Sequence, residues 1–135
     1  MRSAYWVAIS AALLSSAATA SDGRYEAARR TGLEVAINSG PFIGKEFETL
    51  CFATEVDVTA IQCAVLNEVD EEAGRAMYFL EQIDPKSGAD LVTECGNGRL
   101  PSGTVRPSCR LYLKAKVDEN GHLFALGYEQ AEVQE

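Results

Sequence analysis

Four cysteines are the residues of this chain best suited to specific chemistry. Cys51, Cys63, Cys95 and Cys109 are separated by 11, 31 and 13 residues, so no two have the C-x-x-C spacing of zinc sites and redox motifs. An even number of widely spaced cysteines is typical of disulfide-bonded proteins in oxidising compartments. We therefore predict two disulfides, which the strand pairing described below assigns as Cys95–Cys109 and, by elimination, Cys51–Cys63.

Side chains suited to catalysis or metal binding are few. The single histidine, His122, follows an Asn-Gly pair, a place where imidazoles are usually solvated. Glu81 lies in an apolar run, where burial would raise the pKa of its carboxyl, although an exposed position is more common. The acids within residues 68–72 lack the EF-hand spacing, which favours a solvated turn over a calcium site. No phosphate-binding loop, GxSxG or HExxH motif is present. We expect no catalytic residue, no metal and no cofactor.

One set of basic and aromatic residues could contact a ligand, and we call it the basic stripe. It consists of Arg110, Tyr112, Lys114 and Lys116. These residues alternate with apolar ones, so they would share the side of a strand that faces away from the core. A peptide or polymer strand could bind there. The alternative is that they are ordinary solvent-facing residues that balance nearby acids.

Two strands joined by a turn would position the basic stripe. Residues 109–117 alternate, and the core side would hold Leu111, Leu113, Ala115 and Val117. The Asn-Gly pair at residues 120–121 is a strong hairpin signal. A two-residue turn would place Val117 opposite Phe124 and Leu113 opposite Tyr128. A four-residue turn would shift these pairs by two and keep the same faces.

Pairing with a further strand indicates the Cys95–Cys109 bond. Pairing residues 91–95 with residues 109–113 across this bond would join their apolar sides and would place Glu94 opposite Arg110. The bond would stabilise the fold by about 3 kcal/mol. The intervening segment, residues 96–108, is rich in turn-forming residues.

The middle of the chain predicts more strands. Residues 47–58 alternate, with Leu50, Phe52, Val56 and Val58 on one side, and residues 76–83 are apolar on both sides, as in a central strand. Residues 59–74 fit a strand, which we favour, with Ile61, Cys63, Val65 and Val69 on one face. They also fit a helix begun by a Thr-x-x-Gln capping box. Residues 21–41 fit a short helix or a leader, ahead of one β domain over residues 42–135.

Residues 1–20 have the features of a cleavable signal peptide. A basic residue, Arg2, precedes an apolar run over residues 5–14, and Ala-Thr-Ala follows at residues 18–20. The run is too short to span a bilayer. We expect cleavage near Ala20, a periplasmic or secreted location, and no transmembrane segment in the mature chain.

The charge balance bears on the partner. Removing residues 1–20 would take away one of the 12 basic residues and none of the 20 acidic ones, leaving a net charge of −9. Such a charge argues against nucleic acid and anionic membranes as partners, and it suits a cationic protein.

A β meander preceded by Phe42-Ile43-Gly44-Lys45 resembles the OB-fold modules found among small exported bacterial proteins. In those modules a Gly-Lys-containing lead-in opens the first strand, and a late strand like Leu111–Val117 closes the barrel. The resemblance covers about residues 42–133. It implies a mainly β fold, an antiparallel barrel or meander of five to six strands with two disulfides. An α+β fold with a helix at residues 60–73 is the alternative.

These observations predict a non-enzymatic exported module of the bacterial envelope that binds an unidentified protein or polymer. The alternative is an acidic inhibitor of a cationic secreted enzyme, such as a lysozyme or a protease, with residues 96–108 as the inhibitory loop. An uncharacterised hydrolase is the third hypothesis.

Overall fold

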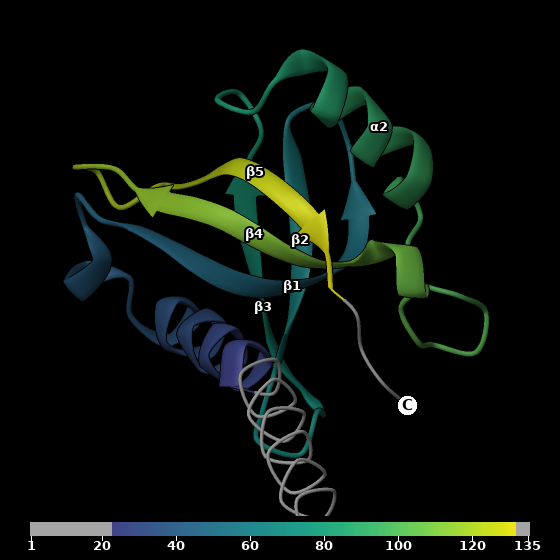
Figure 1. Ribbon diagram of the computed structural model, residues 1–135, viewed down its shortest axis with the longest axis horizontal. Coiled ribbons are helices and arrows are strands. Elements are labelled where there is room, and N and C mark those ends of the chain that lie inside the picture. Colours follow the sequence, from purple (N-terminus) through teal and green to yellow (C-terminus); the bar gives the residue numbers. More distant parts are fainter. Residues whose placement is uncertain (1–22, 132–135) are drawn as a thin grey trace, which may run out of the picture.

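The described part of the chain is residues 23–131 of the computed structural model (Figure 1). The predicted signal peptide and its cleavage site lie outside these residues. Helical residues 23–37 come first, and the remaining elements follow as η1 (Gly40–Phe42), β1 (Glu46–Val56), β2 (Ala60–Leu66), β3 (Glu72–Phe79), α2 (Pro85–Cys95), η2 (Pro107–Cys109), β4 (Arg110–Val117) and β5 (Leu123–Gln130).

The five strands form one mixed sheet in the order β1-β2-β3-β5-β4, and β4 pairs in turn with β1. The mainly β fold with two disulfides is confirmed. The expected all-antiparallel arrangement is wrong at one junction, because β3 and β5 are parallel and share the single pair Phe79–Phe124. The chain passes through α2 and β4 before β5, which lets β5 start beside the end of β3 and run in the same direction.

A bulge in β1 explains why its predicted face was only partly right. The pairing with β2 shifts between Ala53 and Glu55. One extra residue reverses the side on which later residues point. Leu50 therefore packs outside the sheet and Val56 packs inside it. Val58, expected on the same face, lies in the turn beyond β1 and is 87% exposed.

Residues 59–74 form a strand, a turn and the start of the next strand, so the helical alternative is wrong. Ile61, Cys63 and Val65 of β2 share one face, as predicted. They are buried in the larger of two hydrophobic clusters, which we call the inner core. Val69 is 69% exposed because it lies in the turn between β2 and β3. The strand predicted over residues 76–83 begins and ends earlier than expected, because β3 covers Glu72–Phe79. Met77, on its outer side, is 42% exposed.

The strand predicted over residues 91–95 is instead the last part of α2. Asp84 caps this helix by accepting a hydrogen bond from Ser87 N at 3.1 Å, and Pro85 occupies its first turn. Leu91 and Cys95, four residues apart, are its buried side chains. The Cys95–Cys109 disulfide is confirmed, but it joins the end of a helix to the start of β4 rather than two strands.

The turn of the β4–β5 hairpin matches neither the two-residue nor the four-residue turn that the sequence predicted. Val117 pairs with Leu123, not with Phe124, because residues 118–122 form the turn. A register shift between Lys114 and Ala115 then absorbs one residue. Leu113 pairs with Tyr128 beyond that shift, as the two-residue turn had placed it.

Two helical segments cover opposite sides of the sheet (Figure 1). Leu91 and Cys95 of α2 belong to the inner core, which also contains the Cys51–Cys63 disulfide. Helical residues 23–37 help to form a second, smaller cluster outside β1 and β4. We call it the outer cluster, and its buried members are Ala28, Leu50, Leu66, Tyr112 and Ala131. No helix of residues 23–131 is long and apolar enough to cross a membrane.

Candidate functional site

Helical residues 23–37, which we call the N-terminal helix, cover Tyr112 in the middle of the basic stripe. Tyr112 is only 7% exposed and belongs to the outer cluster, so it cannot serve as an open aromatic platform. The guanidinium of Arg24 lies 4.1 Å from the centre of its ring. Arg24 also donates hydrogen bonds to Glu48 at 2.8 and 2.9 Å and forms an ion pair with Glu129.

The other members of the basic stripe lie apart. Lys114 is exposed, and its ammonium is 3.5 Å from a carboxylate oxygen of Glu46. Lys116 is half-buried near the far end of β4. Arg110 donates from Nε to the carbonyl of Val105 at 3.1 Å. The covered ring of Tyr112 therefore separates Arg110 from Lys114 and Lys116, and the four residues do not form a continuous binding surface.

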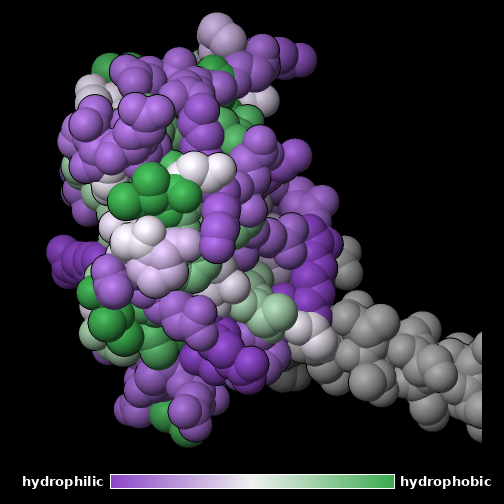
Figure 2. Space-filling model, turned by 90° about the vertical axis from the view of Figure 1, so that its left-hand side faces the viewer, coloured by the Kyte–Doolittle hydropathy of each residue, from purple (hydrophilic) through white to green (hydrophobic). Residues whose placement is uncertain are grey.

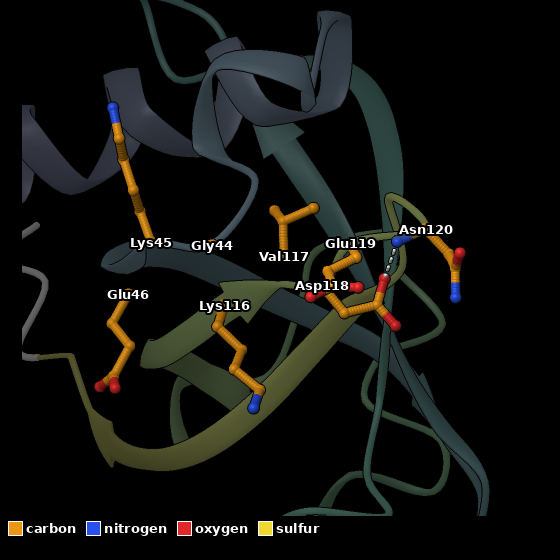
Figure 3. Close-up of a pocket in the computed structure, with 8 residues that line it drawn as sticks. All are labelled: Gly44, Lys45, Glu46, Lys116, Val117, Asp118, Glu119 and Asn120. Carbon is orange, nitrogen blue, oxygen red and sulfur yellow. Dashed lines mark hydrogen bonds between the residues drawn. The ribbon is translucent and has the colours of Figure 1, made fainter.

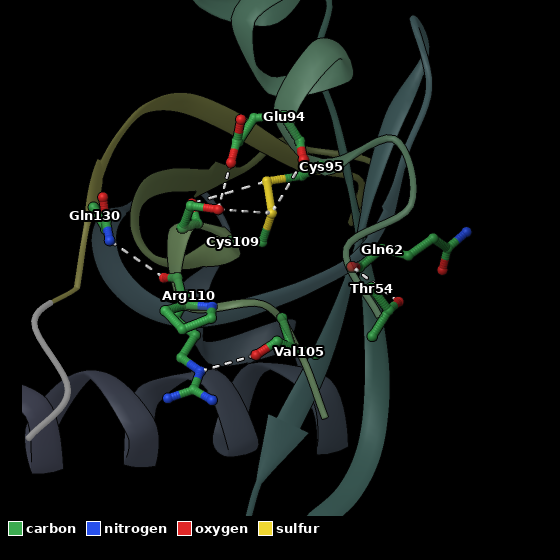
Figure 4. The surroundings of a disulfide bond; sticks show 10 residues. Thr54, Gln62, Glu94, Cys95, Val105, Cys109, Arg110 and Gln130 are labelled. Carbon is green, nitrogen blue, oxygen red and sulfur yellow. Dashed lines mark hydrogen bonds between the residues drawn. A yellow bond between two sulfur atoms is a disulfide. The ribbon is translucent and has the colours of Figure 1, made fainter. Parts of the chain in front are cut away.

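A second candidate, residues 96–108, is a surface loop that we call the braced loop. The Cys95–Cys109 bond closes its base, with 5.7 Å between the two Cα atoms (Figure 4). Beside the bond, Ser108 Oγ donates to the Glu94 carboxylate at 2.5 Å. The hydrogen bond from Arg110 Nε to the Val105 carbonyl holds the second half of the loop, and the Val105 side chain is buried in the inner core. The base of the loop is thus held by covalent, polar and apolar contacts.

Backbone contact with β1 anchors the near side of the braced loop. Gly98 N donates to the Thr54 carbonyl at 3.0 Å, at the bulge of β1. A Cβ atom at Gly98 would lie 2.0 Å from the carbonyl oxygen of Ala53, so only glycine allows this approach. Arg106 N in turn donates to Gly98 O at 2.8 Å. The loop is therefore attached to the sheet at its start and to itself at its end.

The outer part of the braced loop is a small hairpin. Arg99 and Val105 form an antiparallel bridge, and Leu100 N donates to Thr104 O at 2.8 Å. Gly103, whose φ is 95°, closes the turn by donating to the Leu100 carbonyl at 2.8 Å. Pro101 takes the second turn position, where its fixed φ is favourable.

The tip of this hairpin is exposed and uncharged. Residues 101–104 are exposed, and Leu100 is half-buried. Arg99 supports the tip from below, since it donates to the Gly103 carbonyl at 2.6 Å and to the Glu72 carboxylate at 3.0 Å. The tip projects at the side of the molecule opposite the β4–β5 turn (Figure 1). The tip is thus a protrusion that backbone and side-chain hydrogen bonds hold from within the loop.

The surface depression beside the β4–β5 turn does not gather chemical groups. Its lining includes Lys45, Glu46, Lys116 and Asp118, and Figure 3 shows these side chains pointing apart rather than toward a common point. The face that carries this turn is largely hydrophilic, with apolar residues in small separate groups (Figure 2). Neither view shows a place prepared for a ligand.

Groups for acid–base or metal chemistry do not converge in the described structure. His122 is exposed, and its Nδ1 lies 3.6 Å from Asp118 Oδ2 in the turn. Glu81 and the acids of residues 68–72 are exposed. Burial raises the pKa of Tyr78 to about 12, so its hydroxyl keeps its proton at neutral pH. Within residues 23–131, no three His, Cys, Asp or Glu side chains lie close enough together to hold a metal.

Comparison with family models, with curated proteins and with solved structures gives no match. The case for a site therefore rests on geometry. That geometry favours the braced loop, for which the sequence offered two signals: a disulfide across residues 96–108, and Pro and Gly at turn spacing. What the sequence did not reveal was the attachment of Gly98 to β1.

Proposed function

We propose that this chain is a non-enzymatic binding module exported to the bacterial envelope, and that the tip of the braced loop contacts its partner. The observation that carries the proposal is an exposed hairpin tip on a base fixed by a disulfide and by backbone hydrogen bonds. A loop already held in one conformation loses little entropy on binding. Rigid protruding loops suit concave sites on a partner.

The proposed framework is an OB-like barrel. The order β1-β2-β3-β5-β4 with return to β1, and a helix between β3 and β4, supports it. Two disulfides suit an oxidising compartment outside the cytoplasm.

A comparison of two surface variants tests the proposal. The mature protein is immobilised and exposed to envelope extract, and the retained proteins are quantified by mass spectrometry. The double variant Leu100→Asp, Thr104→Asp should lose a specific partner by more than about tenfold, since charge at a central contact is costly. Val58→Asp is the matched control, because Val58 is 87% exposed in the β1–β2 turn. Loss of the partner in the control but not in the loop variant would place the contact elsewhere and refute the proposal.

The braced loop also favours one alternative, an inhibitor of a cationic secreted enzyme. Insertion of its tip into an active-site cleft would block substrate, and the net charge of the mature chain would speed the encounter. Titration of a basic lysozyme and a basic protease with this protein should then reduce activity, less so at high salt. Unchanged activity with these enzymes and continued capture of another partner would leave only the binding module.

A further inference from the structure

Two asparagines, Asn97 and Asn120, are each followed by glycine, which makes both of them candidates for spontaneous deamidation. Glycine favours this reaction because it has no side chain to shield its backbone nitrogen, and because its backbone adopts many conformations. Both asparagines are exposed. Sequence and exposure therefore do not distinguish the two sites, and the surrounding backbone must do so.

The reaction requires the backbone nitrogen of the glycine to be free. After losing its proton to solvent, this nitrogen attacks the side-chain carbonyl carbon of the asparagine. A nitrogen–carbon bond forms, the bond from that carbon to Nδ2 breaks, and the amide group takes a proton from water and leaves as ammonia. Water then opens the cyclic imide to aspartate or isoaspartate. In sum, one amide and one water give one carboxylate and one ammonium ion.

At Asn97, other parts of the molecule hold the glycine that follows. Gly98 N, the nitrogen that would attack, donates to the Thr54 carbonyl of β1 at 3.0 Å, and the Gly98 carbonyl accepts from Arg106 N at 2.8 Å. Gly98 is buried, and the Cys95–Cys109 bond closes the loop around it. To free this nitrogen, the start of the braced loop must leave the sheet.

At Asn120, the hydrogen bond of the glycine nitrogen lies within the β4–β5 turn itself. Gly121 N donates to the Asp118 carbonyl, three residues earlier, at 3.1 Å. Figure 3 shows the Asn120 side chain directed outward from this turn. The turn can open without displacing another element. Such local openings cost much less free energy than openings that detach a packed segment.

We propose that Asn120 is the deamidation site of the folded protein and that the attachment of Gly98 to β1 protects Asn97. Conversion of Asn120 adds a carboxylate to the β4–β5 turn, at the side of the molecule opposite the braced loop (Figure 1). The isoaspartate product also lengthens the main chain there by one carbon atom. At Asn97 the same lengthening would occur beside Gly98, where even a Cβ atom would lie 2.0 Å from the Ala53 carbonyl oxygen. The protected site is thus the one at which the product would disrupt a contact with the sheet.

Peptide mapping by mass spectrometry tests the assignment on the mature protein, incubated at mildly alkaline pH with both disulfides intact. Asn120 should convert more than about tenfold faster than Asn97, because detaching the base of the loop costs more free energy than opening an exposed turn. The same measurement on the reduced and alkylated protein in urea is the control. There neither glycine nitrogen is held by the fold, so Asn97 should convert at a rate close to that of Asn120.

Two matched variants check the site by the intact mass of the folded protein. Asn120→Gln should abolish most of the conversion, because glutamine would have to close a larger, six-membered ring. Asn97→Gln should convert like the wild type.

Three outcomes would overturn the proposal. The first is equal rates at the two sites of the folded protein, whether both are fast or both are slow. The second is conversion that persists in folded Asn120→Gln at the wild-type rate. The third is an Asn97 that remains as slow relative to Asn120 in urea as in the folded protein, which would assign the difference to the flanking residues instead of the fold.

Discussion

The two sides of β4 have the same alternating sequence pattern but different surroundings. On the inner side, Leu111, Leu113, Ala115 and Val117 are each at most 1% exposed. On the outer side, Tyr112 is buried beneath the N-terminal helix, whereas Lys114, two residues on, has a side chain that is 68% exposed. Alternation thus decides the side on which a residue lies. Whether that side meets solvent is decided by a segment about eighty residues earlier in the sequence.

Truncation of a side chain on the inner side of β4 should lower the free energy of unfolding the most. Leu113→Ala should lower the free energy of unfolding by about 2–5 kcal/mol, because Leu113 is fully buried and its neighbours cannot fill the space. Urea unfolding with both disulfides intact would measure the change. Lys114→Ala is the matched control, expected to stay within about 0.5 kcal/mol. Equal effects of the two changes would contradict the assignment of the inner side.

Removal of the covered ring on the outer side should have an intermediate effect. Tyr112→Ala should lower the free energy of unfolding by about 2–3 kcal/mol, less than full core truncation of an aromatic residue, because the outer cluster is small. The same urea titration applies. Tyr112→Phe keeps the ring under Arg24 and Ala28 and should cost less than about 1 kcal/mol. A Tyr112→Ala variant as stable as Lys114→Ala would mean that the helix does not cover β4 in solution.

Acid should weaken the outer side through the ion pairs of the N-terminal helix, and this effect should be the smallest of the three. The hydrogen bonds from Arg24 lower the pKa of Glu48, and those from Arg29 lower the pKa of Glu26, below the usual 4.5. A carboxyl with a lowered pKa in the folded state adds stability above the unfolded value, and this is lost as the pH falls through the folded pKa. Glu48→Gln should therefore lower the urea midpoint at neutral pH, and its difference from wild type should disappear in acid.

The control for the acid experiment is Glu34→Gln, which removes the same charge at an exposed position of the N-terminal helix. Its urea midpoint should stay close to that of the wild type at every pH. A Glu48→Gln variant that also matches the wild type at neutral pH would show that the Arg24–Glu48 pair does not fasten the helix.

The sequence by itself determined much of the inner core. Period-two alternation assigned Leu113 and Val65 to the inner side, because successive side chains of a strand must point to opposite faces. The cysteine count and spacing indicated two disulfides. Local signals could do this because each depends on neighbouring residues or on a covalent bond.

The candidate site depended more on tertiary structure. Residues 84–95 carried a helix signal, Asp-Pro-x-Ser, that the strand interpretation of Leu91–Cys95 overlooked. The pairing argument for that strand reached the right disulfide by the wrong geometry, since a helix end can bring Cys95 as close to Cys109 as a strand can.

Only tertiary structure decided which outer surfaces are available. Tyr112 is covered by Ala28 and Arg24, Gly98 is attached to β1 at its bulge, and β3 keeps an open edge because β5 leaves it after one pair. None of these contacts joins residues close in sequence. They result from how two helices and five strands pack together, and local preferences do not determine that arrangement.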